Sequence, residues 1–326
     1  RRPVILGGLV VYVLTSVGCA FAAAAGQLVL LRFLQGLAAC GGVVLARTMV
    51  RDLAERDQAA RAMSLMMACT SIAPMLAPLI GGQVLWFLGW RAIFWVLAAV
   101  GVVAFIFAWL RLPETLHPDY RQPLVLSSIV KRFGELLRHR AFMGYAFTGT
   151  FMFSALLSFL SGSPFVFIEK YGISPRLYGL VFGSMVVFMT LGSLLNAKFA
   201  PVFGAGRILR YAVFVPAVSG LTALVLGLIE ARYGTIGLWP FLGCFAPQIA
   251  TISLIAPNSM AMALQRYPHM AGTASSLMGV MQFGIGAVFG AVVGQTFDGT
   301  IAPMTTAMGI AGVLCLLSHR LLVRHG

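Results

Sequence analysis

The chain has 326 residues, of which 60% are hydrophobic and only 10% are charged. Soluble domains carry about 25% charged residues because their surface needs a polar coat, so this composition excludes a soluble globular protein and indicates a bilayer as the solvent. The net charge of +14 would suit nucleic-acid binding, but the placement of the basic residues along the chain argues against it.

The hydrophobic residues cluster in blocks of about 20, the number that an α-helix needs to cross about 30 Å of hydrocarbon at about 1.5 Å per residue. In chain order the blocks are roughly Val4–Ala24, Leu28–Val50, Met63–Leu85, Ala92–Leu110, Ala141–Ile168, Leu177–Phe199, Ile208–Ile229, Leu238–Leu264, Gly272–Val293 and Ile301–Leu322. The first block is too long for a cleaved signal peptide. We therefore predict an all-α membrane protein with about ten transmembrane helices.

The basic residues predict the orientation of the chain. With the N-terminus in the cytoplasm, eighteen of the 23 Lys and Arg residues lie at or near cytoplasmic helix ends, four lie outside and Arg32 lies within a span. Cytoplasmic loops of membrane proteins carry an excess of Lys and Arg. We therefore expect both termini to be cytoplasmic, and we expect the lipid bilayer rather than nucleic acid to be the partner of the positive charge.

The longest polar segment, Arg111–Arg140, separates four predicted spans from six. We predict three parts: an N-terminal bundle at residues 1–110, a cytoplasmic linker at 111–140, whose basic second half suits a surface helix, and a C-terminal bundle at 141–326. Many transporters consist of two six-helix halves, and this chain starts abruptly with R-R-P-V-I-L. We therefore expect two further helices to precede it in the whole protein.

The second block carries the one charged residue that is predicted to lie inside a span. Arg32 stands in L-R-F-L-Q-G, and Gln35 and Gly36 follow it by three and four residues, so all three share one helix face. Either the long side chain reaches the interface and water, or the cation lines a cavity. An intramembrane arginine on a small, polar stripe is a candidate functional site, and Arg32, Gln35 and Gly36 are our candidates.

The third block contains A-P-M-L-A-P-L-I-G-G, from Ala73 to Gly82. Pro74 and Pro78 are four residues apart and lie on one face, where each removes a backbone donor and bends the helix. Gly81 and Gly82 then permit close helix contact. Ordinary packing is the alternative, but the combination favours a conformational hinge and a tight helix seam.

Several polar or small residues recur at helical spacing in the later blocks. Ser154, Ser158 and Ser161 face either a cavity or a neighbouring helix, and the sequence alone leaves this open. The run G-x-x-x-G-x-x-x-G from Gly286 to Gly294 is typical of a close-packing face. Other mid-span polar groups suit an interhelical hydrogen bond and a substrate contact equally, and these are Asn196, Gln248, Asn258 and Gln282.

No residue set in the spans indicates catalysis or a metal site. All nine acidic residues are assigned to loops or helix ends, and all five histidines to loops or the C-terminal tail. The five cysteines lie inside apolar blocks without a C-x-x-C pair, as small buried hydrophobic residues do. A membrane enzyme or receptor would need catalytic groups at depth or an external domain, and a channel would need a repeated filter segment. Neither class is supported.

Together these residues resemble the major facilitator superfamily, and within it the Bcr/CflA drug-resistance transporters. The stretch R-F-L-Q-G-L-A-A-C-G-G-V-V-L-A-R-T-M-V-R-D is similar to the family's helix-four motif. A-P-M-L-A-P-L-I-G-G is similar to the antiporter motif of helix five, with Ala73 and Ala77 where the general pattern has glycine. Further stretches, among them G-W-R-A-I-F-W, P-E-T-L, S-G-S-P-F-V-F-I-E and A-G-T-A-S-S-L-M-G-V-M-Q-F-G-I-G-A, extend the resemblance over the whole chain.

This resemblance implies a major facilitator fold of twelve helices in two pseudo-symmetric bundles, of which the chain holds about ten. It implies a monomeric exporter of drugs or small metabolites in a bacterial inner membrane, driven by the proton gradient without a cofactor or metal, so that protons and a small-molecule substrate are its partners. Arg32 would serve proton coupling, Arg1 and Arg2 a cytoplasmic gate, and Ala73–Gly82 the hinge and seam. The family's membrane acid lies in helix one, which this chain lacks. A proton-coupled uptake symporter of the same fold is the alternative.

Overall fold

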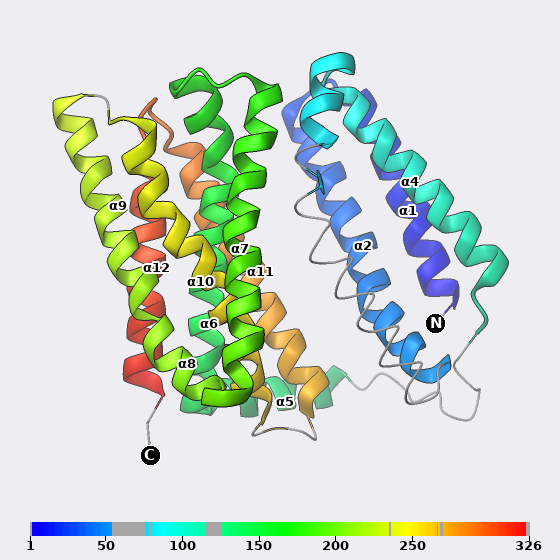
Figure 1. Ribbon diagram of the computed structural model, residues 1–326. Coiled ribbons are helices and arrows are strands. Elements are labelled where there is room, and N and C mark those ends of the chain that lie inside the picture. The colour runs from blue at the N-terminus through cyan, green and yellow to red at the C-terminus, as the bar shows by residue number, and fades with distance from the viewer. Residues whose placement is uncertain are drawn as a thin grey trace. The chain divides into compact units, whose positions relative to one another are not determined.

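The computed structural model describes residues 2–53, 76–77, 80–114, 126–234, 236–265, 267 and 270–323. Within these ranges the chain is helical and contains no strand, in agreement with the predicted fold class (Figure 1). The helices are α1 (Arg2–Phe21), α2 (Ala25–Leu53), α4 (Trp90–Arg111), α5 (Leu126–Arg138), α6 (Arg140–Pro164), the π-helix η2 (Phe165–Lys170), α7 (Pro175–Phe203), α8 (Ala205–Ala212), α9 (Phe214–Tyr233), α10 (Leu238–Gln265), α11 (Ala271–Gln295) and α12 (Ala302–Leu322).

Among the described residues, eight helical segments are long and apolar enough to cross a membrane. The apolar part of α2, Ala25–Cys40, is shorter than such a span. Most of the third predicted block lies outside the described residues, although residues 80–88 are helical. The count of ten spans therefore stays a prediction at these two places.

Two prolines set local boundaries that the apolar blocks did not show. The predicted block Ile208–Ile229 lies within one apolar helical segment, Ala205–Tyr233, which a single turn at Val213 divides into α8 and α9. Pro216 has no N–H to donate to the carbonyl of Ala212, four residues earlier, so the regular helix is interrupted there. Pro164 ends the regular part of α6, and the chain continues as η2 instead of leaving the helix.

The chain forms two compact units, and each is described by itself. The first comprises Arg1–Leu124 and Pro175–Gly183. In it, α1 packs against both α2 and α4. Small residues permit the close approach: a Cβ atom on Gly8 would lie 3.0 Å from the carbonyl oxygen of Ala38 in α2, and one on Gly101 would lie 2.8 Å from Val13 in α1.

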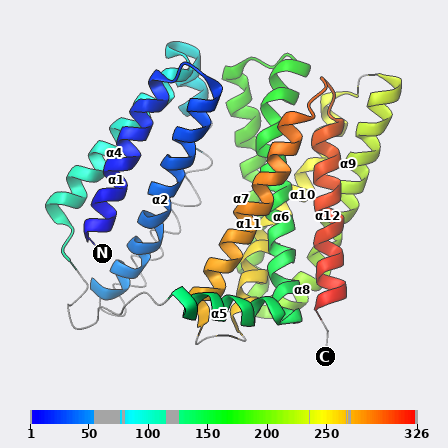
Figure 2. The same cartoon turned by 180° about the vertical axis from the view of Figure 1, so that it is seen from behind.

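The second unit comprises Val125–Ser174 and Ser184–Gly326. Helix α6 packs against α5, α10, α11 and α12, and α9 packs against α10 and α12. The largest of its fully buried side chains are aromatic, namely Phe142, Phe159, Phe167, Phe241 and Phe245. The predicted surface helix exists as α5, which lies across the end of this unit where α6 and α11 begin (Figure 2).

Glycines make the α6–α11 contact, as predicted from their spacing. A Cβ atom on Gly286 would lie 2.6 Å from Leu157 Cδ1, and one on Gly290 would lie 2.6 Å from Ser161 Oγ. No described atom lies within 4 Å of a Cβ atom placed on Gly294. The first two glycines of the predicted face therefore pack and the third does not.

Candidate functional site

In the first unit, Arg32 begins a chain of hydrogen bonds from α2 to α1. Its Nη1 donates to Gln35 Oε1 at 2.7 Å, and Gln35 Nε2 donates to Ser16 Oγ at 2.6 Å. The Ser16 hydroxyl in turn donates to the carbonyl of Tyr12 at 2.6 Å. Gln35 is 3% exposed and Ser16 is fully buried. The hydrogen bonds that follow Arg32 in this series therefore lie inside the α1–α2 pair.

The guanidinium group of Arg32 lies on the surface of this unit. Its Cζ atom is 5.6 Å from the centroid of the Phe94 ring in α4, a distance that suits a cation–π contact. Arg32 is seven residues beyond Ala25, where α2 begins, which is about 10 Å along the helix. The three candidates from the sequence therefore differ in exposure: Gln35 is buried, whereas Arg32 and Gly36 are exposed.

The helix face that carries Arg32 and Gly36 is open within the described part of the unit. No described atom lies within 4 Å of a Cβ atom placed on Gly36, and the same is true of Gly42. Among the described residues, this small-residue stripe therefore leaves room for another surface or a ligand.

The hinge and seam candidates lie largely outside the described residues. Ala73, Pro74 and Pro78 belong to that undescribed part. Ala77 is helical and exposed, and Gly81 and Gly82 belong to the helical stretch at residues 80–88. No described atom lies within 4 Å of a Cβ atom placed on Gly81. The hinge and seam therefore stay predictions.

Arg2 connects the start of α1 to the end of α4. Its backbone N–H donates to Glu114 Oε2 at 3.1 Å, and its Nη2 donates to the carbonyl of Trp109 at 2.8 Å. A basic side chain at the carboxyl end of a helix satisfies a terminal carbonyl and interacts favourably with the helix dipole. Arg1 lies outside the described residues, and the predicted gate remains a prediction for both.

In the second unit, the predicted serine stripe belongs to helix packing. Ser154 and Ser158 are fully buried, and their hydroxyls donate to the carbonyls of Thr150 and Ser154, each at 2.9 Å. Ser161 is partly exposed and lies against Gly290 of α11. A serine that bonds its own helix backbone is a common solution inside membranes, and the sequence did not distinguish it from a cavity-lining serine.

Three of the four other polar candidates form contacts between helices. Asn258 Nδ2 in α10 donates to Asn196 Oδ1 in α7 at 2.6 Å. Gln248 Nε2 in α10 donates to the carbonyl of Met308 in α12 at 3.2 Å. The fourth, Gln282 of α11, is partly exposed, and its Nε2 would lie 3.3 Å from a Cβ atom on Gly149 of α6. Of these four candidates, Gln282 is therefore the one least engaged in contacts between helices.

A buried ion pair at the opposite end of this unit from α5 was missed from the sequence. Glu230, in the last turn of α9, is 4% exposed and pairs with Lys170 at the end of η2. Its Oε2 also accepts the backbone N–H of Ile301 at 2.9 Å, just before α12. The sequence placed Glu230 correctly at a helix end. Its long-range partners, however, are not visible in the local pattern.

Two titratable groups near this pair are perturbed. Burial and the negative charge of Glu230 raise the pKa of Tyr171 to about 12, and its hydroxyl donates to the carbonyl of Ile236 at 3.0 Å. The side-chain hydrogen bond from Thr300 lowers the pKa of Asp298. At neutral pH this end of the unit therefore holds a neutral phenol at Tyr171 and an ionised carboxylate at Asp298.

The assignment of every histidine to a loop or tail is wrong for His319. This residue lies in α12 and is 1% exposed, and its ring centroid is 6.1 Å from that of Tyr145 in α6. The segment L-L-S-H-R-L-L keeps its apolar helical pattern through this position, so α12 extends to Leu322 and carries the imidazole into the bundle.

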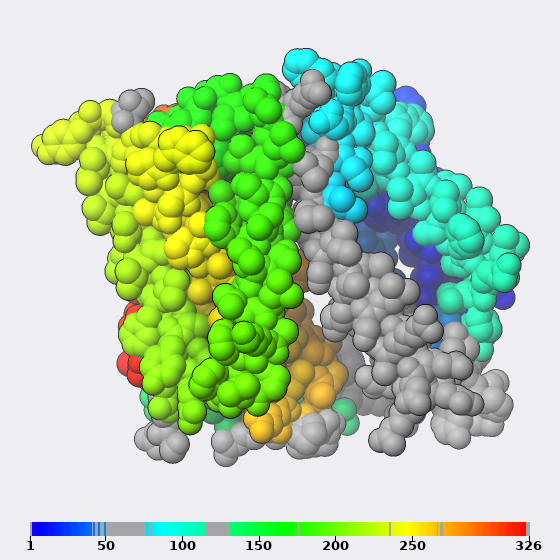
Figure 3. Space-filling view, viewed as in Figure 1, coloured from blue at the N-terminus to red at the C-terminus, as the bar shows by residue number. Residues whose placement is uncertain are grey.

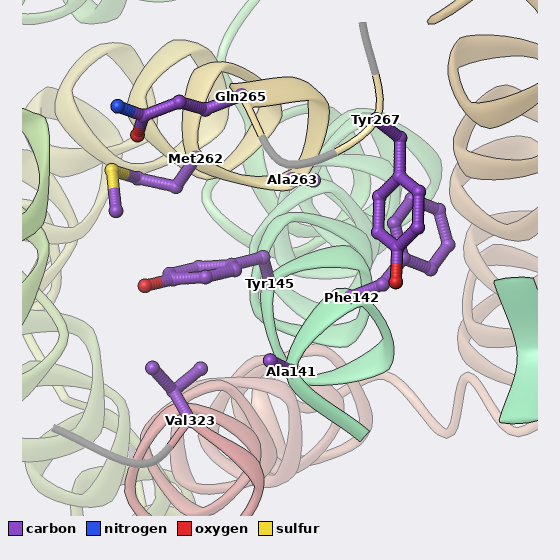
Figure 4. Close-up of a pocket in the computed structure, with 8 residues that line it drawn as sticks. All are labelled: Ala141, Phe142, Tyr145, Met262, Ala263, Gln265, Tyr267 and Val323. Atoms are coloured by element: carbon purple, nitrogen blue, oxygen red, sulfur yellow. The ribbon is translucent and has the colours of Figure 1, made fainter. Parts of the chain in front are cut away.

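A cavity of about 300 Å³ opens close to His319's neighbour Tyr145, where α6 begins and α10 and α12 end. Figure 4 shows Tyr145 projecting between Met262 and Val323, with the amide of Gln265 above. The remaining lining residues are Ala141, Phe142, Ala263 and Tyr267. Aromatic walls with a few polar groups are typical of small-molecule pockets, and this volume is at their lower limit. None of the sequence candidates lines it.

Comparison with known proteins identifies related sequences over almost the whole chain. The family model for the Major Facilitator Superfamily matches residues 1–291. The bicyclomycin resistance protein homolog of Haemophilus influenzae is 34% identical over 319 residues, which cover 98% of this chain and 79% of that protein. Multidrug resistance protein D of Escherichia coli is 30% identical over 327 residues, with 97% and 79% coverage.

Solved structures with the same fold are more distant in sequence. A bacterial homolog of the human lysosomal transporter Spinster, in an inward-facing and occupied conformation, superposes with a TM-score of 0.69 at 15% identity, covering 98% of this chain and 81% of that one. A bacterial homologue of the iron transporter ferroportin in an inward-facing state gives a TM-score of 0.68 at 13% identity, with 100% and 83% coverage.

Proposed function

The chain belongs to the Major Facilitator Superfamily, and from this membership we propose that it exports drugs or other small metabolites from a bacterial cell in exchange for protons. The superfamily comprises transporters rather than enzymes. The names of two relatives, a bicyclomycin resistance protein homolog and multidrug resistance protein D, support drugs as the substrate class and export as the direction.

We further propose the architecture through which export would occur. Residues 1–110 and 141–326 form two bundles joined by a cytoplasmic linker at 111–140, in a fold of twelve helices. The monomer alternates between inward-open and outward-open states, with the substrate bound between the bundles. Both termini are cytoplasmic, and the hinge and seam comprise Ala73, Pro74, Ala77, Pro78, Gly81 and Gly82.

The observation that carries the coupling proposal is the tethered, exposed charge of Arg32. The side chain is fixed by Gln35 and by the ring of Phe94, and the neutral amide leaves its positive charge intact. A guanidinium does not release its proton in the physiological range, so Arg32 is not itself the proton carrier. A fixed cation lowers the pKa of any carboxyl group that comes within about 4–6 Å, and we propose that Arg32 acts on the proton carrier in this way.

The open face beside Arg32 suits this role. No described atom lies within 4 Å of a Cβ atom placed on Gly36 or Gly42 of α2, so among the described residues this face leaves room for a substrate or a second helix near the guanidinium. From the second unit we keep Gln282, Ser161 and Asn196 as cavity candidates because they remain partly exposed. The two arginines at the start of the chain, Arg1 and Arg2, stay candidates for the cytoplasmic gate.

Transport by the full-length gene product in everted membrane vesicles tests both function and direction. The interior of such vesicles corresponds to the outside of the cell. We expect an interior made acidic to drive accumulation of a substrate chosen from a panel of antibiotics, and a protonophore to abolish it. Proton-driven depletion of preloaded vesicles would instead establish the uptake symporter. Absence of gradient-dependent movement for every panel member would contradict drug export.

A further inference from the structure

A groove lies on the second unit, at the end of the unit that also carries α5, whose place the ribbons show (Figures 1 and 2). It lies among α7, α8, α9 and α10 and has a volume of about 480 Å³. Figure 3 shows this face of the unit, with α10 in yellow between α9 in yellow-green and α7 in green. The lining residues are Phe199, Phe203, Arg207, Ile208, Tyr211, Ala212, Val215, Thr251 and Leu254.

The floor of the groove, meaning its lining apart from Arg207 and Tyr211, offers no free side-chain hydrogen-bonding group to an occupant. Thr251 is the one hydroxyl amino acid of the lining besides Tyr211, and its hydroxyl donates to the carbonyls of Pro247 and Gln248 in its own helix, at 3.1 and 2.8 Å. The other floor residues are hydrocarbon or aromatic. An occupant of this part must therefore be apolar, since an unsatisfied polar group would be costly there.

The inner part of the groove lies within the depth of one leaflet of a bilayer. Arg207 lies in the short helix α8, whereas Thr251 lies fourteen residues before the end of α10. Thr251 is therefore about 20 Å from that end of α10, close to half the thickness of a bilayer including its headgroups. Tyr211 beside Arg207 is 66% exposed, and tyrosine is enriched at the membrane–water interface.

The charge at the shallow end is positive. Arg207 is the one charged residue among the nine that line the groove. Lys198 adds a second cation, because its Nζ lies 5.9 Å from the centroid of the Phe199 ring, which forms part of the wall. Arg210 is exposed on the same short helix. Basic residues at the membrane surface beside an apolar intramembrane groove are the combination that recognises an anionic lipid.

We propose that this groove binds an anionic phospholipid, with one acyl chain along Phe199, Val215 and Leu254 and the phosphate headgroup at Arg207. Its apolar floor excludes a polar ligand, and its cationic rim distinguishes an anionic headgroup from a zwitterionic one. The proposal does not depend on the transported substrate, because it concerns the lipid-facing side of one unit.

Native mass spectrometry of the full-length protein tests the proposal. The protein is equilibrated with equal amounts of phosphatidylglycerol and phosphatidylcholine that carry identical acyl chains, and the ratio of bound lipids is measured. We expect phosphatidylglycerol to be preferred, and Arg207→Gln to reduce that preference about fivefold, the effect of one basic residue near an anionic surface. The matched control is Arg232→Gln, an exposed arginine at the other end of α9, which should leave the ratio unchanged.

A second variant separates the acyl chain from the headgroup. Val215→Trp fills the groove without changing its charge, and we expect it to reduce binding of both lipids while leaving their ratio unchanged. The proposal is overturned by an unchanged ratio in Arg207→Gln, by an equal loss in Arg232→Gln, or by full lipid binding in Val215→Trp. A lipid-free dimer that Val215→Trp dissociates would identify a second copy of the chain as the occupant and would also overturn it.

Discussion

Among the described residues, Arg32 combines an oriented side chain with a charge that no ion pair neutralises. Gln35, which accepts its hydrogen bond, is itself held by Ser16 of α1, so the guanidinium is oriented by an acceptor of fixed position. The aromatic ring of Phe94 supports the cation from α4 without cancelling it. Such an arrangement maintains an electric field at one place, which is what a group that modulates a neighbouring acid requires.

We expect Arg32→Ala to reduce transport by the full-length protein about tenfold to a hundredfold, because a charge-assisted hydrogen bond contributes about 1.5–3 kcal/mol. Membrane insertion should be unchanged or improved, since a charge at depth is costly. Arg32→Lys should also impair transport because the planar fork is lost. Initial rates in everted vesicles, normalised to protein abundance, provide the measurement.

Arg91→Ala is the matched control for Arg32. Arg91 lies at the start of α4, over the ring of Trp90, and donates to the carbonyl of Ala22 at 3.4 Å. It therefore shares the residue type, the unit and an aromatic neighbour, but it sits at a helix end. We expect nearly normal transport. Equal losses of transport in both variants would show that the effect comes from removing an arginine of this unit in general. Normal transport by Arg32→Ala would show that Arg32 only extends its side chain to the membrane interface.

Single residues were predictable where the signal is local. Arg32 stands out in the sequence because it is a charged residue within an apolar run. Glu230 was placed correctly along its helix, but its burial depends on Lys170, sixty residues away, and on the N–H of Ile301. His319 was assigned to a loop or tail although it lies within the predicted block Ile301–Leu322, and the structure places it in α12.

The pair of Lys170 and Glu230 joins three elements, since Glu230 of α9 contacts η2 through Lys170 and the start of α12 through Ile301. Removing one member of a buried pair leaves the other charge uncompensated, at a cost of about 3–5 kcal/mol. We expect Glu230→Gln and Lys170→Met each to lower the thermal unfolding temperature in detergent by several degrees.

The double variant Lys170→Met/Glu230→Gln provides the control for this pair. It removes both charges, so its loss should be clearly smaller than the sum of the two single losses. Additive losses would mean that the two side chains act independently. A Glu230→Gln protein that unfolds at the normal temperature would show that the pair contributes nothing to the stability of this end.

The α6–α11 seam can be tested with two glycines of the same helix. Gly290 leaves no room for a side chain, because Ser161 Oγ would be 2.6 Å from its Cβ atom, whereas Gly279 has no described atom within 4 Å. We expect Gly290→Leu to destabilise the protein by about 1–3 kcal/mol through overpacking, and Gly279→Leu to have little effect. Thermal unfolding of both purified variants gives the comparison, and equal stability would contradict the seam.

Elements were more predictable than their contacts. The length of the apolar runs located the eight spans that the described residues contain, because the bilayer thickness fixes that length. The break at Val213 was missed, although Pro216 contains its cause. The use of Ser154 and Ser158 was undecidable, since whether a polar stripe faces a cavity or a neighbour depends on helices far along the chain. The Asn196–Asn258 hydrogen bond could not be predicted for the same reason, because its two residues lie in different helices.

At the scale of the whole molecule, charge is separated between the two ends of the second unit. The exposed basic residues Lys198, Arg207, Arg210 and Arg320 lie at the end that carries α5, whereas three of the unit's acidic residues, Glu169, Glu230 and Asp298, lie at the opposite end. This separation agrees in direction with the predicted bias, in which eighteen of the 23 basic residues are expected on one side of the membrane. The positive-inside rule assigns that side to the cytoplasm.

Cysteine labelling in intact cells tests this orientation, with the five native cysteines first replaced. Glu135 is exposed on α5, and Tyr233 is 80% exposed at the end of α9, so both positions offer an accessible thiol without disturbing the core. We expect an impermeant maleimide to label Tyr233→Cys in intact cells and to label Glu135→Cys only after the membrane is permeabilised. Labelling of both in permeabilised cells is the control for accessibility. Because the helices cannot turn over individually without carrying several arginines across the bilayer, the reverse pattern would require the whole chain to be inverted, and the positive-inside assignment would then be wrong.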